Sequence, residues 1–267
     1  MYLTPSGAFF DPFEGMKDLK AGRVKFIGDA AERIKEDALR IMRLFRFHAH
    51  FGKTALEPVA LEACQKLAPM LQSLSVERIR AELSKLLKAT DPMPALSAMA
   101  GAGVFIALGQ GKTELSKLKE LIENEHALKA GIDPLLRLYQ LFQSQSGARD
   151  IAIWLKLSRQ NKLFIQSLER ALNGDLPQSE ASMRRYIYHH GVEASKAAAL
   201  CLKQQRLFLY CDEWQVPSFP LQGRDLMARG MLAGPAVGEA LKVLESEWVG
   251  SDFSLTKQML LKQLRTV

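Results

Sequence analysis

Several features that would indicate particular classes of protein are scarce or absent in this sequence. No apolar run approaches the ~20 residues that a membrane-spanning helix needs. The N-terminus has neither the basic segment nor the apolar core of a signal peptide. The three cysteines (Cys64, Cys201 and Cys211) are odd in number and far apart, which is more typical of buried free thiols than of a disulfide or metal set. These absences favour a cytoplasmic protein.

Familiar catalytic signatures are also missing. Residues 109–113, Gly-Gln-Gly-Lys-Thr, resemble the end of a phosphate-binding loop, but Ile106 stands where that motif requires its first glycine, and no strand precedes it. The pairs His48/His50 and His189/His190 have spacings that do not suit a metal site, so we interpret them as structural or surface residues. No Gly-x-Ser-x-Gly elbow is present. The sequence therefore indicates no catalytic residue and no metal ligand.

What is present is the composition of an ordinary globular protein. The 267 residues are 48% hydrophobic and 24% charged, which excludes disordered, collagen-like and low-complexity chains. Lys and Arg number 36 against 29 for Asp and Glu, giving a formal net charge of +7 and a pI of about 9.3. Such an excess permits a polyanionic partner without requiring one. The length suits one large domain or two small ones.

Two parts of the chain differ in the secondary structure that their patterns predict. In the first 28 residues, short apolar segments around a Pro/Gly turn predict a β-hairpin, and the alternating residues 23–27 predict a further strand. A two-stranded hairpin is marginal alone, so we expect a remnant of a larger sheet. From Asp29, which suits an N-cap, a period of 3.6 predicts one long helix up to Gly52. We predict an all-α array of about ten to twelve helices with a short residual β-hairpin at the N-terminus.

One short motif inside this predicted helix could carry chemistry. Asp37 and Arg40 are three residues apart, which places them on one face of a helix. A carboxylate accepts hydrogen bonds and a guanidinium donates them, so the pair matches the edge of cytosine or adenine, where an amino donor adjoins a ring-nitrogen acceptor. Guanine and uracil present the opposite pattern, and unpaired buried polar groups cost roughly 1–3 kcal/mol each. On spacing alone, an ion pair on the helix surface is the simpler interpretation.

Two further groups of charged residues allow a functional and a simpler interpretation. Arg78, Glu82 and Lys85 lie on a helix predicted over residues 76–89 with Ser75 as its N-cap, where they could brace a nucleotide site or form a solvated stripe. Basic residues cluster again later in the chain, near Tyr186 and Tyr188. These are Arg184, Arg185, Lys196, Lys203 and Arg206. Positive charge beside aromatic rings suits RNA contact, although a charge run is usually a solvated face.

The motifs form an ordered set along the chain. They are Asp11-x-x-x-Gly15-x-x-Asp18-Leu19, Arg23-Val24-Lys25-Phe26-Ile27-Gly28-Asp29, Arg33-Ile34-x-Glu36-Asp37-x-x-Arg40-Ile41-x-Arg43-x-x-Arg46-Phe47, Arg78-x-x-x-Glu82-x-x-Lys85 and Phe219-Pro220-Leu221-x-Gly223-x-Asp225-Leu226. Their order and spacing resemble the class II tRNA nucleotidyltransferase and bacterial poly(A) polymerase family. The resemblance runs the length of the chain and is most specific in the first fifty residues.

The resemblance implies a role for each motif. The base of an incoming CTP or ATP would be read by Asp37 and Arg40, supported by Glu36 and Arg43. Movements of a catalytic head and a helical neck would be coupled by Asp11, Gly15 and Asp18. The site would be braced by Arg78, Glu82 and Lys85. The tRNA would be gripped by Arg184, Arg185, Lys196 and Lys203.

The resemblance also implies a division of the chain and a metal. The parts would be a remnant edge of the head with the coupling segment (1–28), a neck with the base-recognition helices (29–90), a helical body (91–175) and an RNA-binding tail (176–267). In the complete family enzyme, two carboxylates of the head hold Mg²⁺, which activates the primer hydroxyl and stabilises the leaving pyrophosphate.

This sequence departs from the family pattern in two ways. Glu14 precedes Gly15 where the family commonly has two glycines, which would stiffen or re-aim the coupling segment. The Gly-Gly-x-x-Arg-Asp, Asp-x-Asp and Arg-Arg-Asp-Phe-Thr-Ile-Asn-Ala motifs of the head are absent.

We therefore expect a truncated chain, the nucleotide- and RNA-recognition portion of a tRNA nucleotidyltransferase that adds CCA, inactive alone and without Mg²⁺ ligands. Alternatives are a poly(A) polymerase-type portion, one half of a split enzyme with a separately encoded head, and a non-catalytic tRNA-binding remnant. None of these involves a membrane or DNA.

Overall fold

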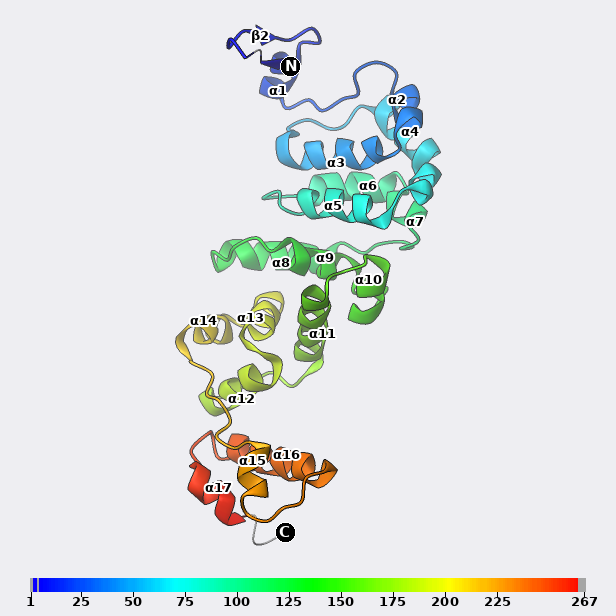
Figure 1. Cartoon of the computed structure of the whole chain (residues 1–267). Coiled ribbons are helices and arrows are strands. Elements are labelled where there is room, and N and C mark those ends of the chain that lie inside the picture. Colours follow the sequence, from blue (N-terminus) through cyan, green and yellow to red (C-terminus); the bar gives the residue numbers. More distant parts are fainter. Residues whose placement is uncertain (1, 4, 264–267) are drawn as a thin grey trace. The chain divides into compact units, whose positions relative to one another are not determined.

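The computed structural model describes residues 2–3 and 5–263, and this part of the chain is almost entirely helical (Figure 1). The helical architecture predicted from the 3.6-residue period is thereby confirmed. Met1, Thr4 and residues 264–267, which belong to the predicted parts 1–28 and 176–267, lie outside the described residues. Strands β1 (Tyr2–Leu3) and β2 (Phe9–Phe10) pair antiparallel, with Tyr2 opposite Phe10.

Helices are more numerous and shorter than the predicted ten to twelve. The described residues form α1 (Gly15–Ala21), α2 (Ala30–Glu36), α3 (Leu39–Phe51), α4 (Pro58–Leu67), the 3₁₀-helix η1 (Ala68–Ser73), α5 (Val76–Leu86), α6 (Met93–Gly101), α7 (Val104–Ala107), α8 (Ser116–Ala127), α9 (Pro134–Phe142), α10 (Ala148–Trp154), α11 (Arg159–Asn173), α12 (Glu180–His190), α13 (Val192–Cys201), α14 (Gln205–Glu213), α15 (Gly223–Met227), α16 (Pro235–Gly250) and α17 (Lys257–Gln263). The number is larger because several stretches with an unbroken 3.6-residue pattern are divided into two helices. The pattern of apolar residues does not reveal a capping residue inside such a stretch.

The strand predicted over residues 23–27 is wrong. In the described residues this segment has no regular secondary structure and pairs with no strand. Its first residue is instead tied back to α1, since the amide N–H of Arg23 donates to the carbonyl of Asp18 (2.9 Å). An alternating pattern gives a strand only where a neighbouring strand supplies the ladder hydrogen bonds, and no such strand lies beside residues 23–27.

Local signals at several helix ends behave as predicted. Asp29 is the N-cap of α2, and its side chain accepts a hydrogen bond from the amide of Glu32 (2.9 Å). Ser75 occupies the N-cap position of α5, although its side chain makes no cap hydrogen bond. The three cysteines are free, as predicted, and burial raises the pKa of each thiol to about 12.

The chain divides into two compact units. The first comprises residues 1–169 with 200–203, and the second comprises residues 170–199 with 204–267. In the first unit, α3 packs against α5 and α6, α2 packs against α4, and α8 packs against α9 (Figure 1). In the second unit, α12 packs against α14 and α15 against α16.

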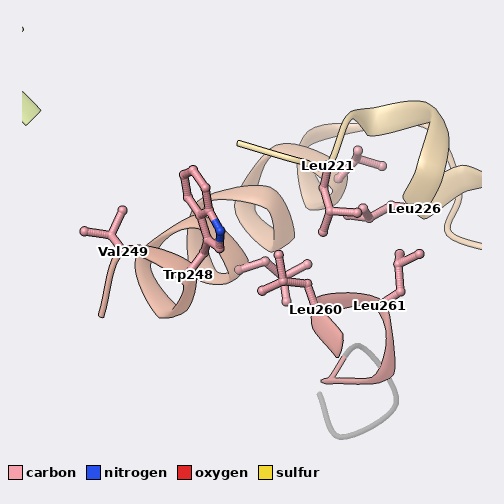
Figure 2. Packing of buried hydrophobic residues seen from close by; sticks show 8 residues of the cluster. Leu221, Leu226, Trp248, Val249, Leu260 and Leu261 are labelled. Carbon is pink, nitrogen blue, oxygen red and sulfur yellow. The ribbon is translucent and has the colours of Figure 1, made fainter. Parts of the chain in front are cut away.

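The C-terminal helices of the second unit have a hydrophobic core of their own. Trp248 lies on α16 and is 3% exposed, and Leu260 on α17 is fully buried beside it (Figure 2). The other buried members are Leu221, Leu226, Val237, Leu244, Val249 and Leu261. Helices α15 to α17 are therefore held together by this core, against which Tyr188 of α12 also packs.

Candidate functional site

The long helix predicted from Asp29 to Gly52 is interrupted at Asp37. Helix α2 ends at Glu36 and α3 begins at Leu39, while the backbone of Asp37 is extended (φ −155°, ψ 105°). The Asp37 carboxylate accepts a hydrogen bond from the amide of Leu39 (3.1 Å). The premise that Asp37 and Arg40 share one face of a continuous helix was therefore wrong. An aspartate side chain offers the backbone an alternative hydrogen bond and so starts a second helix.

The motif predicted on α5 contacts this break directly. Nη2 of Arg78 donates to both carboxylate oxygens of Asp37, at 3.1 and 3.2 Å. The two side chains are 46% and 26% exposed, respectively, so solvent reaches the pair. Two motifs that lie forty-one residues apart in the sequence thus form one polar site.

Arg40 is held by α2 rather than by Asp37. Its Nη1 donates to the Glu36 carboxylate (2.5 Å) and to the Arg33 carbonyl (2.8 Å). The neighbouring guanidinium groups of Arg40 and Arg33 lower the pKa of Glu36. Nε and Nη2 of Arg40 make no hydrogen bond to the described residues and can donate elsewhere. Arg43 lies one turn further along α3 and is exposed.

Glu82 of α5 is the buried member of a second group of ion pairs. It is 4% exposed and pairs with Arg46 of α3 (3.2 Å) and with Lys85 of its own helix (3.5 Å). The Arg46 guanidinium also lies over the Phe47 ring, 4.3 Å from the ring centroid. Sequence reasoning did not select Arg46 as a site residue. Its position three residues after Arg43 in the same motif was the available signal.

The three predicted coupling residues line one cavity of about 650 Å³. Both carboxylate oxygens of Asp11 accept backbone hydrogen bonds at the start of α1, from Gly15 and Met16 (2.8 Å each), and these bonds lower the Asp11 pKa. Asp18 is 8% exposed and pairs with Lys25 (2.9 Å) and Arg23 (2.8 Å), which lower its pKa. The acidic residues of this segment thus fix its local fold.

Backbone conformation explains two features of this segment. Glu14 has φ 52° and ψ 33°, in the left-handed region that favours glycine. The departure noted in the sequence thus places a side chain where glycine is the unstrained residue. Gly22 (φ 66°) lies so close to the loop after α3 that an added Cβ would be 2.4 Å from Cβ of Lys53. Its carbonyl accepts the Lys53 amide (2.9 Å), which anchors the segment to the helices.

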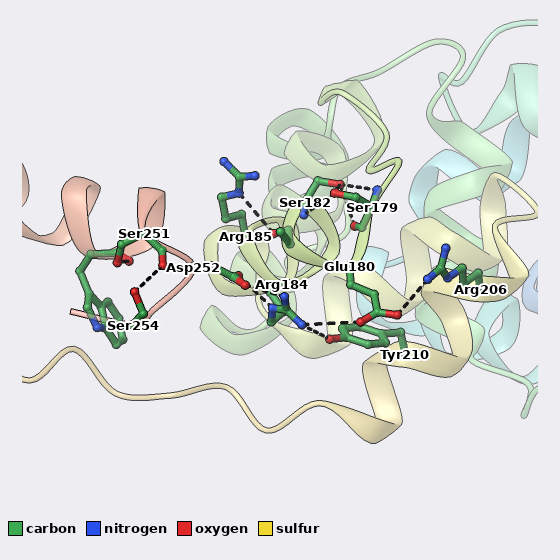
Figure 3. Close-up of polar contacts among 12 residues, drawn as sticks. Ser179, Glu180, Ser182, Arg184, Arg185, Arg206, Tyr210, Ser251, Asp252 and Ser254 are labelled. Atoms are coloured by element: carbon green, nitrogen blue, oxygen red, sulfur yellow. Dashed lines mark hydrogen bonds and ion pairs between the residues drawn. The ribbon is translucent and has the colours of Figure 1, made fainter. Parts of the chain in front are cut away.

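The four predicted RNA-binding residues have different surroundings. Arg184 is bound to Asp252 and Tyr210 (Figure 3). Lys196 reaches both carboxylate oxygens of Asp212 (2.5 Å each). Arg185 is exposed and donates from Nε to the Ala181 carbonyl (3.2 Å). Lys203 is exposed but belongs to the first unit, so the structure does not group it with the other three.

Neither a metal site nor a membrane span is found among residues 2–3 and 5–263. No group of three or more His, Cys, Asp or Glu side chains is arranged to hold a metal ion, so these residues do not fit the Mg²⁺ that the resemblance implies. No helix of the described chain is long and apolar enough to cross a bilayer.

Comparison with known proteins agrees with the motifs. Residues 55–108 match the family described as "Probable RNA and SrmB- binding site of polymerase A". The mitochondrial CCA tRNA nucleotidyltransferase 1 of Danio rerio is 31% identical over 99% of this chain and 64% of its own length. The Bacillus stearothermophilus CCA-adding enzyme in complex with CTP has the same fold over 99% of this chain and 71% of that one (TM-score 0.79, 24% identity).

A second solved structure, the Thermotoga maritima CCA-adding enzyme complexed with tRNA, covers 98% of this chain and 69% of that one (TM-score 0.63, 20% identity). The helical fold is thus that of the matching part of these CCA-adding enzymes. The chain is similar over nearly all of its length to CCA-adding enzymes, and it spans 64% of the length of the curated Danio rerio relative.

Proposed function

We propose that this chain is the nucleotide- and RNA-recognition portion of a tRNA nucleotidyltransferase that adds CCA to tRNA 3′ ends from CTP and ATP. In this proposal, residues 29–90 select the nucleotide base, residues 91–175 form the helical body, and residues 176–267 bind RNA. Sequence similarity to CCA tRNA nucleotidyltransferases supports the proposal, as do the structurally similar enzymes that are complexed with CTP and with tRNA.

The single observation that carries the base-reading role is the unused hydrogen-bonding capacity at the helix break. Oδ1 of Asp37 accepts from Leu39 and Arg78, whereas Oδ2 accepts only the 3.2 Å bond from Arg78. Each carboxylate oxygen has two lone pairs, so Oδ2 can accept from the amino group of cytosine or adenine. Arg40 retains its Nε and Nη2 donors for the adjacent ring nitrogen. The described contacts fix the position of both side chains without exhausting them.

The base-reading role is tested by replacing one acceptor with a donor. In Asp37→Asn, we expect the preference for CTP and ATP over GTP and UTP to fall by about tenfold, because the amide loses one acceptor for the base amino group. Isothermal titration with the four nucleotides measures this ratio. Glu32→Gln, which neutralises an exposed carboxylate of α2, is the matched control. Unchanged selectivity in Asp37→Asn would refute the assignment.

Nucleotide transfer is proposed to need more than this chain. The matched region is 64% of the Danio rerio relative, and the Mg²⁺-binding head motifs are not in the sequence. Labelled CTP and ATP should not be incorporated when the chain alone is incubated with Mg²⁺ and tRNA lacking its CCA end. Labelled product would contradict this, and activity regained on mixing with a separately encoded head would identify a split enzyme.

A second candidate is a non-catalytic RNA-binding protein, favoured by the match of residues 55–108 to a probable RNA-binding family. It predicts tRNA binding without nucleotide preference and unchanged binding in Asp37→Asn. The same titrations, with tRNA added as a ligand, therefore separate the two candidates. A polymer of adenosine made by a reconstituted enzyme would instead indicate a poly(A) polymerase-type portion.

A further inference from the structure

The C-terminal helices are joined to the rest of the second unit by a segment without regular secondary structure. Helix α14 ends at Glu213, and residues 214–222 have no regular secondary structure before α15 begins at Gly223. Helices α15 to α17 have their own core (Figure 2). Contacts with α12 and α14 set their position. One of these contacts comes from α16, where Glu245 accepts a hydrogen bond from the Tyr188 hydroxyl of α12.

The turn between α16 and α17 supplies such contacts through an unusual backbone. Asp252 (φ 57°) and Phe253 (φ 65°) are consecutive non-glycine residues in the left-handed region, which costs about 1–2 kcal/mol per residue. The amides of Asp252 and Phe253 donate to the Val249 and Trp248 carbonyls at 3.1 and 2.9 Å. The contacts of both side chains must therefore offset the cost of this conformation.

The Asp252 carboxylate reaches a single arginine of α12. Nε of Arg184 donates to Oδ1 (2.9 Å) and Nη2 to Oδ2 (2.5 Å), which is a bidentate ion pair. Nη1 of Arg184 donates to the Tyr210 hydroxyl on α14 (2.9 Å). One guanidinium thus joins α12, α14 and the turn (Figure 3). The pair raises the pKa of Arg184 and lowers that of Asp252.

The Phe253 ring completes the junction on its apolar side. Its centroid lies 4.9 Å from that of Trp248, 5.3 Å from that of Tyr188 on α12, and 5.4 Å from that of Trp214 after α14. Aromatic pairs at these separations contribute beyond the area that they bury. The polar and aromatic contacts together define what we term the tail latch: Arg184, Tyr210, Asp252 and Phe253.

We propose that Arg184 is a positioning residue for RNA binding: through the tail latch it fixes helices α15 to α17 on α12 and α14, rather than contacting a phosphate itself. Three of its five N–H groups are already engaged, and the bound carboxylate opposes the approach of a phosphate. Its neighbour Arg185 is exposed and is available for that contact. This inference rests on the proposed RNA-binding function.

The direction in which one substitution changes the affinity for tRNA distinguishes a positioning role of Arg184 from direct contact with phosphate. Asp252→Asn removes a negative charge near the proposed RNA surface, so simple electrostatics predicts equal or tighter tRNA binding. The latch predicts weaker binding, by about fivefold, because fewer molecules hold the binding arrangement. Arg184→Gln should weaken binding similarly, and the double variant should be no worse than either single variant. Tighter or unchanged binding in Asp252→Asn would overturn the proposal.

Salt dependence supplies a matched comparison between neighbouring arginines. When a direct phosphate contact is lost, the plot of log K against log salt becomes less steep, by about 0.7–0.9 in slope. Fluorescence anisotropy with labelled tRNA should show this change for Arg185→Gln but not for Arg184→Gln. A reduced slope in Arg184→Gln would show that Arg184 contacts phosphate, and the proposal would fail. Glu213→Gln controls for the loss of an exposed carboxylate on α14.

Hydrogen exchange tests the latch without RNA. Amides of α15 to α17 should exchange faster in Asp252→Asn and Arg184→Gln than in the parent chain, whereas α3 and α5 should keep their rates, which shows that the chain is folded. Tyr210→Phe, which removes only a hydroxyl, should give a smaller acceleration. Unchanged exchange in all three variants refutes the latch. If the parent chain fails to bind tRNA, the proposed RNA function fails, while exchange still decides whether the latch exists.

Discussion

The two compact units each contain a bidentate arginine–carboxylate pair, but in very different surroundings. In the first unit, Arg137 and Glu125 are 0% and 2% exposed, and the guanidinium also donates to the carbonyls of Leu87 and Ala89 after α5 (2.9 and 2.6 Å). In the second unit, the Arg184 and Asp252 side chains are 25% and 37% exposed.

The difference separates a fixed joint from one that can open. Water cannot replace either partner of a fully buried pair, so losing one partner leaves an uncompensated charge. A part-exposed pair exchanges its contacts for water at little cost. The buried pair holds the end of α5, the helix that carries Arg78 and Glu82. The exposed pair holds the turn before α17, where reversible opening is physically possible.

The largest difference in stability between the two pairs should appear when one partner of each pair is replaced. Arg137→Met is expected to destabilise the first unit by about 3–5 kcal/mol, because Glu125 stays buried and charged. Asp252→Asn should cost the second unit about 1 kcal/mol or less. Urea denaturation followed by hydrogen exchange in each unit measures both.

The control for the buried pair removes both of its members. Arg137→Met with Glu125→Leu should recover part of the loss, because no buried charge is then left unpaired. If Arg137→Met cost no more than Asp252→Asn, the distinction between the two joints would be wrong.

Both units should lose a smaller amount of stability on mild acidification. Burial lowers the pKa of His48 in the first unit and of His190 in the second below the ordinary 6.5. Each folded unit therefore binds a proton less readily than its unfolded chain, so its stability is full above pH 6.5 and falls as pH drops through the lowered value. Unfolding curves at pH 7.5 and 5.5 test this. The stability of the first unit should depend less on pH in His48→Phe, and that of the second unit should depend less on pH in His190→Phe.

The Asp252 carboxylate of the exposed pair should respond at lower pH. Because Arg184 lowers the Asp252 pKa below the ordinary 3.8, the stabilisation is full above that pH and is lost only as pH falls through the lowered value. Exchange in α15 to α17 that accelerated already between pH 7.5 and 5.5 in His190→Phe would contradict this assignment.

The smallest effect concerns the left-handed residues. Glu14 is exposed and its side chain pairs with the exposed Lys17 (3.1 Å), so Glu14→Gly should stabilise α1 by about 0.5–1 kcal/mol through relief of backbone strain. Asp252→Gly relieves the same strain but loses the bond to Arg184, so it should not stabilise the second unit. Thermal unfolding and exchange in α1 measure the first, and a destabilised Glu14→Gly would show that its side chain has a further role.

Sequence reasoning succeeded where one signal acts over a few residues. The 3.6-residue period predicted the helical architecture, Asp29 predicted a helix start that is confirmed, and widely spaced cysteines predicted free thiols. It failed at residues 23–27, because a strand depends on a partner that the pattern does not name. It missed the break at Asp37, because the same side chain can continue a helix or cap the next one.

The sequence by itself determined the helices, the net charge and the ordered motifs, because these follow from residue type and short-range spacing. Only the tertiary structure decided which charges meet. Arg78 reaches Asp37 across forty-one positions and Arg184 reaches Asp252 across sixty-eight. Such pairs depend on how helices pack, and nearly every charged residue on a helix has several opposite charges that it could meet. Packing selects one partner, and with it decides whether an arginine faces a ligand or holds the fold.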